Sequence, residues 1–232
     1  IGNWVKTIEQ CNGKYIALCE GDDYWIDPYK LQKQVDFLEA NEDFTISCTN
    51  GTVVDSKGHR LDVIFKTPKN RVFSIEDAYL DNIATTCTIV FRSRNIQKYK
   101  QENKLPFGDY PLLLHLLESG KGWYLNEKTA AYRSSGGGVW SSVTKDIDRA
   151  KLWYIFYKGM IQKYNHPIFI QEAKLKSAKY NRMLFYTKLD EELNISKINA
   201  LKVLTHSFEV NRISKSFSFK DYLFKLKKII TY

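Results

Sequence analysis

The chain has 232 residues and a mass of 27.1 kDa, and it carries a formal net charge of +9. This length suffices for one well-packed core with an appended subdomain. A hydrophobic fraction of 44% and an aromatic fraction of 14% exclude an intrinsically disordered chain. No stretch of 18 or more apolar residues is present, so the sequence predicts no membrane-spanning helix.

The chain begins at Ile1 and enters a helical pattern over 3–11 at once, which predicts a fragment or a processed start. No secretory signal pattern is present. The four cysteines are scattered and show no metal-binding or redox spacing. They are predicted to be reduced core residues of a cytoplasmic protein, without a disulfide or zinc framework; they are Cys11, Cys19, Cys48 and Cys87.

A short apolar run, Tyr15–Cys19, follows Gly13 and predicts a buried strand. Glu20, Asp22 and Asp23 come directly after it. Ligands of open α/β sheets bind beyond the carboxyl ends of strands, and carboxylates there could hold a divalent cation and, through it, phosphates. The alternative is an acidic turn that caps the next helix, a role to which Asp27 contributes.

The run EGDDYW at 20–25, followed by PYKL and a helix, resembles the metal-binding strand end of family 2 glycosyltransferases with the GT-A fold. The resemblance covers roughly residues 1–140 and only the second half of that family's domain, because the family's nucleotide-binding first half finds no match. It implies an α/β fold, a partial Rossmann-like GT-A domain over 1–144. A mostly parallel sheet with helices on both faces is expected there, followed by a basic α-helical extension over 145–232.

The same resemblance implies the chemistry of the acidic run. Asp23 would bind Mn²⁺ or Mg²⁺ directly, and Asp22 would contact the ribose or a metal-bound water. The cation would hold the diphosphate of a nucleoside-diphosphate sugar, with a UDP-sugar as first choice. Glu20 and Trp25 are assigned to the acceptor.

Further elements follow in chain order. A helix is predicted over 28–40, with Leu31, Val35 and Leu38 on its buried stripe and Lys and Gln residues outward. Strands are predicted over 44–48 and 52–54, separated by a turn at Asn50-Gly51. Residues 55–58 predict another turn, and 74–77 resemble a helix start.

A strand rich in β-branched residues is predicted over 83–91. A similar strand of the family runs beneath the acceptor site, which implies that Thr85 and Thr86 present hydroxyl groups to the acceptor. The alternative, that both threonines are simply good strand formers, stays open.

Asp109 precedes a nearly all-apolar helix at 112–117. An N-cap is the ordinary role of an Asp at such a position. The resemblance implies that Asp109 is the general base that deprotonates the acceptor hydroxyl. His115, inside the helix, is predicted to be a core histidine with satisfied hydrogen bonds rather than a ligand.

A short strand is predicted over 123–125, and three glycines follow at 136–138. Arg133 before them and Trp140 after them would suit a lid, with the guanidinium group on the diphosphate and the indole on the sugar. A linker into the C-terminal part is the open alternative.

The basic excess lies in residues 145–232, which hold 18 Lys and Arg against 8 Asp and Glu. Helical patterns begin at 146 and are interrupted at 165–167. The last pattern, 220–232, is a basic amphipathic helix that could lie on the inner face of an anionic membrane or pack on the protein. No aromatic-basic groove indicates nucleic-acid binding.

Taken with the resemblance, these features predict metal-dependent, inverting transfer of a sugar from a nucleoside-diphosphate sugar to a saccharide or lipid-linked acceptor. Cell-surface polysaccharide or lipopolysaccharide synthesis is the implied pathway. The alternative is a non-catalytic, truncated relative that binds sugar or a protein partner. A metal-dependent phosphate hydrolase is less well supported, because the four histidines lie far from the acids in sequence.

Overall fold

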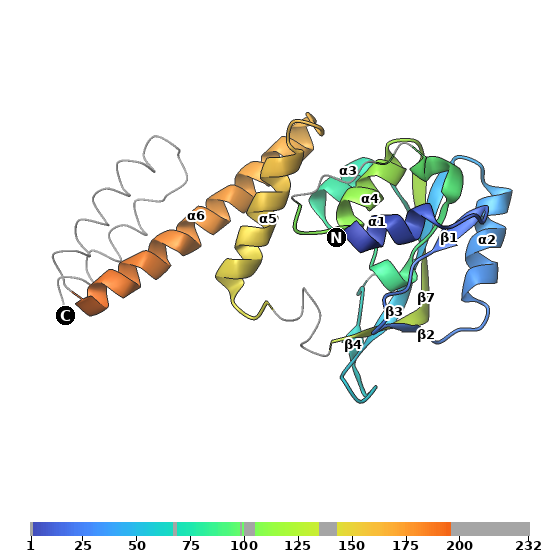
Figure 1. Ribbon diagram of the computed structural model, residues 1–232, viewed down its shortest axis with the longest axis horizontal. Helices are drawn as coiled ribbons and strands as arrows, with labels where there is room; N and C mark the ends of the chain where they lie inside the picture. The colour runs from blue at the N-terminus through green and yellow to red at the C-terminus, as the bar shows by residue number, and fades with distance from the viewer. Residues whose placement is uncertain (1, 67–68, 98, 100–104, 135–142, 196–232) are drawn as a thin grey trace. The chain divides into compact units, whose positions relative to one another are not determined.

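The computed structural model describes residues 2–66, 69–97, 99, 105–134 and 143–195. The chain divides into two compact units. Unit 1 comprises residues 1–143 with 162–169 and contains the sheet (Figure 1), whereas unit 2 comprises residues 144–161 with 170–232. No helix among the described residues is long and apolar enough to cross a membrane.

A mixed, seven-stranded sheet forms the centre of unit 1. Strands β1, β6, β3, β7 and β2 follow one another in that order, while β4 pairs with β3 and β5 pairs with β7. The bounds are Tyr15–Ala17 (β1), Tyr24–Trp25 (β2), Phe44–Val54 (β3), Arg60–Val63 (β4), Arg71–Phe73 (β5), Val90–Arg92 (β6) and Lys121–Arg133 (β7).

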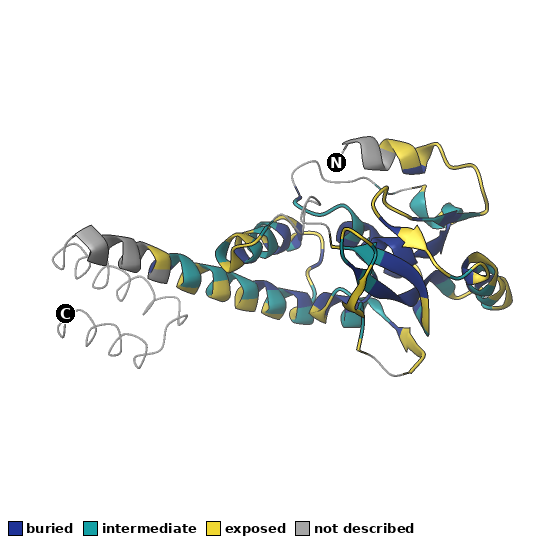
Figure 2. Cartoon of the chain, turned by 90° about the horizontal axis from the view of Figure 1, so that it is seen from below, coloured by how far each residue is buried: buried dark blue, intermediate teal, exposed yellow. Residues whose placement is uncertain are grey.

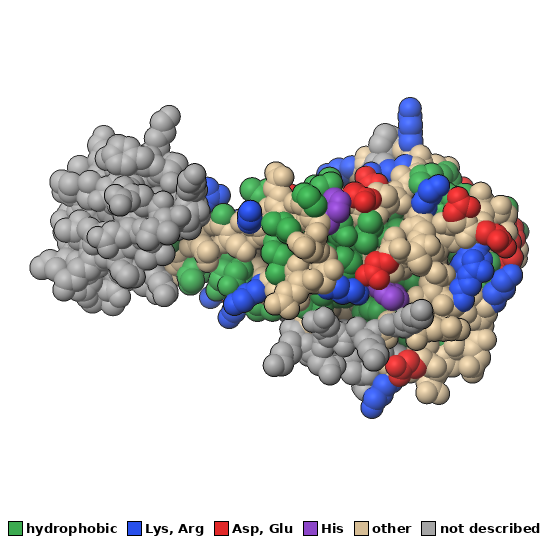
Figure 3. Space-filling view, turned by 90° about the horizontal axis from the view of Figure 1, so that it is seen from above, with side chains coloured by type: hydrophobic (Ala, Val, Ile, Leu, Met, Phe, Trp, Pro, Cys, Tyr) green, Lys and Arg blue, Asp and Glu red, His purple; other side chains and the backbone are tan. Residues whose placement is uncertain are grey.

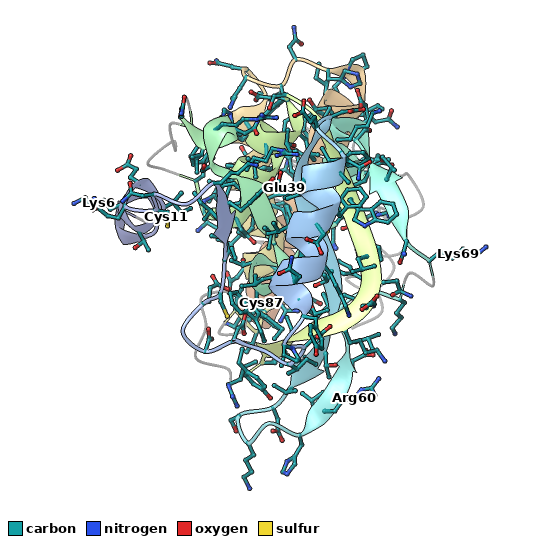
Figure 4. All side chains as sticks on the ribbon, turned by 90° about the vertical axis from the view of Figure 1, so that its right-hand side faces the viewer. Lys6, Cys11, Glu39, Arg60, Lys69 and Cys87 are labelled. Carbon is teal, nitrogen blue, oxygen red and sulfur yellow. The ribbon has the colours of Figure 1, made fainter. Side chains whose placement is uncertain are left out.

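Helices cover both faces of this sheet (Figures 1 and 4). On one face, Phe37 of α2 stacks on Trp123 of β7, with ring centroids 4.7 Å apart. On the other face, the Leu116 carbonyl of α4 accepts a hydrogen bond from the Thr45 hydroxyl at 2.8 Å. The helices of unit 1 are α1 (Gly2–Glu9), α2 (Lys30–Ala40), α3 (Ile75–Leu80) and α4 (Asp109–Leu117), with 3₁₀ turns η1 (Thr86–Thr88) and η2 (Ser93–Ile96).

The α/β fold class is confirmed, but the sheet is mixed rather than mostly parallel. Strands β3 and β7 run parallel, and the other five described pairs are antiparallel. The short turn at 55–58 joins β3 to β4, and a connection of this length permits only antiparallel pairing. The parallel partner β7 is reached after a long connection that includes α4.

Strand β3 is continuous through Asn50-Gly51, so the predicted turn at this position is wrong. A Cβ atom at Gly51 would lie 2.7 Å from the carbonyl oxygen of Ala130 in β7. The Asn50 amide donates to Asn126 Oδ1 at 3.0 Å. The Asn-Gly pair therefore serves close strand packing and a side-chain hydrogen bond, neither of which a turn signal distinguishes.

Helix α2 buries Leu38 as predicted, but the rest of its buried face differs from the prediction. Lys30, Gln34 and Leu38 are buried, whereas Leu31 is 36% exposed. The polar residues can be buried because Gln34 accepts a hydrogen bond from Lys30 Nζ at 2.8 Å and donates to the carbonyl oxygen of Ser47 at 2.9 Å. Hydrophobic periodicity alone could not reveal this polar network.

The predicted strand over 83–91 is also largely wrong, since only Val90–Arg92 forms a strand. The preceding residues turn into η1, where the Thr88 hydroxyl and the Thr88 N–H both donate to the Thr85 carbonyl, at 2.7 and 2.8 Å. A local hydrogen bond from a threonine side chain thus competes with strand pairing.

Two local predictions are confirmed. Ser74 begins α3 with a capping box, in which its hydroxyl accepts the Asp77 N–H and the Asp77 carboxylate accepts the Ser74 N–H. At the turn over 55–58, Gly58 adopts a φ of 88°, and the Asp55 carboxylate accepts the N–H groups two and four residues ahead.

Buried residues of unit 1 are concentrated in its sheet (Figure 2), and many core residues come from β3, β6 and α4. Cys48 and Cys87 belong to this core as predicted, but Cys11 and Cys19 are exposed. On the face of unit 1 seen in Figure 3, acidic and basic side chains are interspersed. Fully buried core residues include Ile46, Ile89, Phe91, Leu112, Leu113 and Leu114.

The described part of unit 2 is helical, as expected, from α5 (Asp146–Met160) and α6 (Pro167–Ile195), the latter beginning in unit 1. Tyr154 stacks on Tyr180 with centroids 5.1 Å apart. The predicted amphipathic helix over 220–232 lies outside the described residues.

Candidate active site

Residues 20–23, called the acidic turn here, connect the edge strand β1 to β2. The Asp23 N–H donates to the Glu20 carbonyl at 3.0 Å and closes the turn. Asp22 is exposed, whereas Asp23 is only 9% exposed. The turn therefore presents one carboxylate to solvent and holds another inside the protein.

The two oxygens of the Asp23 carboxylate differ. Oδ1 accepts the backbone N–H of Arg133 at 2.8 Å, while Oδ2 is buried and has no hydrogen-bond partner among the described residues. Burial raises the pKa of Asp23, against the opposing effects of the Arg133 N–H and the nearby Cys87 thiol. A buried acceptor without a partner is unfavourable, so this oxygen is suited to a bound positive charge.

Asp109 is the first residue of α4, and Gly108 is the N-cap. Asp109 is therefore not the N-cap residue, although its carboxylate satisfies one N–H of the first turn. Its Oδ1 accepts the N–H of Tyr110 at 2.9 Å, and its Oδ2 accepts the Thr86 hydroxyl at 3.4 Å. Burial of the carboxyl group raises the pKa of Asp109, an effect that these bonds oppose.

Thr86 connects Asp109 to the acidic turn. Its side chain also lies near enough to Glu20 to act on the pKa of that carboxyl group, and only 5% of Thr86 is exposed. Much of Glu20 is exposed, yet the surroundings of its carboxyl group raise its pKa to about 7, first through desolvation and then through the charges of Asp109, Asp23 and Asp22. Acids from distant parts of the sequence thus meet at one place.

Trp25 and Thr85, both assigned to the acceptor, flank this cluster. Trp25 is 37% exposed, and its Nε1 donates to the Cys87 carbonyl at 3.0 Å. Lys30 Nζ lies 4.9 Å from the centroid of the indole. Thr85 is half-buried. Figure 4 shows Cys87 beside the N-terminal end of α2.

Arg133 ends β7 beside the acidic turn. Its Nε donates to the Asp22 carbonyl at 3.0 Å, and its Nη1 donates to the carbonyls of Ser56 and Asp55 at 2.9 and 3.2 Å. The guanidinium group is therefore already bound to main-chain oxygens. Trp140 and the three glycines lie outside the described residues, so the lid stays a prediction.

Three residues near the acids were not foreseen, and neither was the buried Lys30 beside Trp25. The charges of Asp23, Glu20 and Asp22 raise the pKa of Tyr132, although desolvation contributes more. Tyr132 could have been found from the sequence, because it directly precedes Arg133, which was assigned to the site. Nothing in the sequence pattern distinguished the other three, which are Lys30, Cys87 and Tyr99.

Among the described residues, no group of three or more His, Cys, Asp or Glu side chains could by itself hold a metal ion. Mg²⁺ is commonly bound by one or two carboxylates and completes its coordination with phosphate and water oxygens. Exposed Asp22 and the unpartnered Oδ2 of Asp23 fit this second mode. His115 is not part of it, because its Nε2 is hydrogen-bonded to the Asn95 carbonyl at 3.0 Å, as a satisfied histidine should be.

No protein-family model matches the chain. Over 158 residues the chain is 30% identical to uncharacterised proteins of Mycobacterium tuberculosis (strain ATCC 25618 / H37Rv) and Mycobacterium bovis. The match covers 68% of this chain and 45% of each relative.

A further relative of the chain is the "Putative teichuronic acid biosynthesis glycosyltransferase TuaG" of Bacillus subtilis. It is 26% identical over 152 residues, which cover 65% of this chain and 58% of the relative. The chain is related to a glycosyltransferase. It spans about half the length of the curated relatives that it matches.

Proposed function

We propose that this chain forms the catalytic part of a glycosyltransferase. The enzyme would move a sugar from a nucleoside-diphosphate sugar to an acceptor hydroxyl with inversion, and a UDP-sugar is the proposed donor. Cell-surface polysaccharide synthesis is the proposed pathway, and a saccharide or lipid-linked saccharide is the acceptor. The observation that carries this proposal is the proximity of Asp109 to the acids of the acidic turn, with Thr86 donating to Asp109 and lying close to Glu20. The TuaG relationship supports the same class of reaction.

Asp23 and Asp22 would hold Mn²⁺ or Mg²⁺. Such a cation supplies Lewis-acid stabilisation of the departing diphosphate. Asp23 is suited to this role because one of its oxygens is fixed by the Arg133 N–H while the other has no partner among the described residues. Asp22, exposed beside it, is free to accept from ribose hydroxyls or metal-bound water.

Asp109 is the proposed general base. It would take the proton of the attacking acceptor hydroxyl on the face of the sugar opposite the diphosphate, which leads to inversion. Two donors, the Tyr110 N–H and the Thr86 hydroxyl, fix the plane of its carboxylate. Burial favours the neutral form and so strengthens the carboxylate as a base.

The acceptor would lie between the acids and Trp25. The indole N–H of Trp25 is satisfied by the protein, so the exposed part of the ring offers an apolar surface to a sugar. Glu20 and the hydroxyls of Thr85 and Thr86 would bind acceptor hydroxyl groups. These roles extend the proposal and share its test.

Calorimetry of UDP binding, with and without Mn²⁺, tests the proposal. The wild-type chain should bind UDP only with Mn²⁺, and Asp23→Asn should abolish that binding because it removes an anionic ligand. Asp62→Asn, an exposed Asp on β4, is the matched control. Equal Mn²⁺-dependent binding by the wild type and Asp23→Asn would contradict the proposed metal site.

The alternative is a non-catalytic domain that binds sugar in the same place. The partial coverage of the relatives supports this alternative, because the chain matches only part of their length. The two functions differ in turnover. UDP release from UDP-sugars that depends on Asp109 supports the enzyme. Sugar binding that is unchanged in Asp109→Asn, without UDP release by the wild type, supports the alternative.

A further inference from the structure

The side chain of Arg133 joins two segments that are distant in the sequence. Its Nε bonds to the main chain of the acidic turn at Asp22, and its Nη1 bonds to the main chain at Asp55 and Ser56. All three acceptors are carbonyl oxygens rather than carboxylates. The guanidinium group thus fixes backbone positions and does not serve as a counter-ion in these bonds.

A second set of contacts places the same two segments side by side. Tyr24 directly follows the acidic turn, and the guanidinium carbon of Arg133 lies 5.3 Å from the centroid of its ring. A Cβ atom at Gly58 would lie 3.7 Å from the Tyr24 hydroxyl. The acidic turn and the turn at 55–58 are therefore neighbours, and the Arg133 side chain contacts both of them.

The turn at 55–58 is held in place by its own hydrogen bonds. The Asp55 carboxylate accepts the N–H groups of Lys57 and His59, each at 2.8 Å, and the Gly58 N–H donates to the Asp55 carbonyl at 3.1 Å. These local bonds hold the turn independently of the acidic turn. A segment tied to it through Arg133 gains a fixed position.

An arginine binds a diphosphate best through its planar fork, with two parallel N–H bonds to one phosphate. In Arg133, both Nε and Nη1 already donate to protein carbonyls. We propose that Arg133 is a positioning residue that ties the acidic turn to the turn at 55–58, and that it is not a ligand of the diphosphate. The consequence for metal binding rests on the proposed function.

Hydrogen–deuterium exchange of the full chain tests the tie directly. In Arg133→Gln and Arg133→Lys, amides of both turns, 20–24 and 55–59, should exchange about tenfold faster, because bonds from a charged donor are lost. Lysine keeps the charge but cannot bridge three carbonyls. Arg60→Gln is the control, since Arg60 is exposed on the same hairpin and points away from the protein in Figure 4.

Electron paramagnetic resonance of added Mn²⁺, without nucleotide, measures the affinity of the chain for the ion. In a variant that is still folded, general destabilisation would not lower this affinity. Both Arg133 variants should bind Mn²⁺ alone about tenfold more weakly, as expected when a partner that orients a metal ligand is lost. Thermal unfolding and circular dichroism establish that each variant is folded before it is compared.

Unchanged exchange in both turns would overturn the inference. So would Mn²⁺ affinity that stays at the wild-type value while UDP binding is lost in Arg133→Gln and kept in Arg133→Lys, because that pattern identifies a diphosphate ligand. If the wild-type chain binds no Mn²⁺ without nucleotide, the variants are compared for Mn²⁺ affinity with UDP present; if it binds none even then, the proposed metal site fails. The exchange result alone then decides the role of Arg133.

Discussion

Replacing Lys30 by methionine should change how the stability of unit 1 depends on pH. Lys30 is 1% exposed, and its ammonium group has Gln34 and the face of Trp25 as neighbours, with no carboxylate among the described residues bonded to it. Desolvation lowers the pKa of Lys30 to about 8, although the charges of Cys87, Cys19 and Cys48 act in the other direction. The buried amine therefore loses its proton more easily than the same amine in the unfolded chain.

The sign and size of the effect follow from proton linkage. Below pH 8 the amine is protonated in both states, and the folded state bears the full cost of the buried charge. Between pH 8 and the unfolded pKa of 10.5, the unfolded chain binds more protons, so the stability of the wild type rises with pH. From pH 7 to pH 10 the gain is on the order of 2–3 kcal/mol. The Lys30→Met variant has no proton to lose at this position and should show no such rise.

Urea unfolding followed by tryptophan fluorescence, at several pH values from 7 to 10, measures this gain as the change in the difference between wild type and Lys30→Met. The loss of the bond to Gln34 adds an offset that does not depend on pH. Lys33→Met is the control: Lys33 pairs with Glu127 and Asp27, which raise its pKa, so its contribution stays constant until the pH approaches 10.5. Parallel stability curves for wild type and Lys30→Met would refute the reasoning.

Three further changes have defined outcomes. Asp109→Asn should lower UDP release from UDP-sugars by about 10²–10⁴-fold and leave UDP binding intact, and wild-type release would contradict its role as base. Gly51→Ala should lower the unfolding free energy by about 1–3 kcal/mol in urea titrations, because a Cβ would lie 2.7 Å from the Ala130 carbonyl oxygen; unchanged stability would mean that the strands separate freely. Ser74→Ala should cost about 1 kcal/mol through loss of the capping box, whereas Ser74→Thr should retain most of it, and equal losses would argue against the cap.

Local signals of the sequence predicted local structure well. The Ser74 capping box and the turn at 55–58 each depend on residues within four positions of one another, so short patterns suffice to identify them. The same limitation explains the error at Asn50-Gly51. A glycine required by a neighbouring strand, here by Ala130, has the same appearance in sequence as a glycine required by a turn.

The acids of the candidate site were found from sequence, but their relationship was not. The position of the acidic turn after a strand end could be read directly, whereas its proximity to Asp109 involves Thr86, which was predicted to lie in a strand. Whether Asp109 is the N-cap residue depended on whether the helix begins at Asp109 or one residue later. Gly108 occupies the N-cap position, and the Asp109 carboxylate accepts the Tyr110 N–H and the Thr86 hydroxyl.

Buried polar groups were the least predictable feature. Lys30 and Gln34 lie on the face of α2 that hydrophobic spacing assigned to solvent, because Gln34 satisfies main-chain groups of β3 and η1. Such a network is defined by carbonyls distant in sequence, and no pattern within a helix contains them.

Strand β7 has a consequence for the order in which a newly made chain can fold. β2 and β5 each pair with β7 and, among the described strands, with no other, and the parallel partner of β3 is also β7. During synthesis at roughly 5–20 residues per second, every residue before Lys121 leaves the ribosome before any of these pairs can form. The acidic turn is completed last, because its contacts depend on Arg133, the last residue of β7. The Arg133 N–H donates to the Asp23 carboxylate, and the Arg133 side chain ties the acidic turn to the 55–58 turn. A nascent chain would complete its candidate site as the final event in the assembly of the sheet.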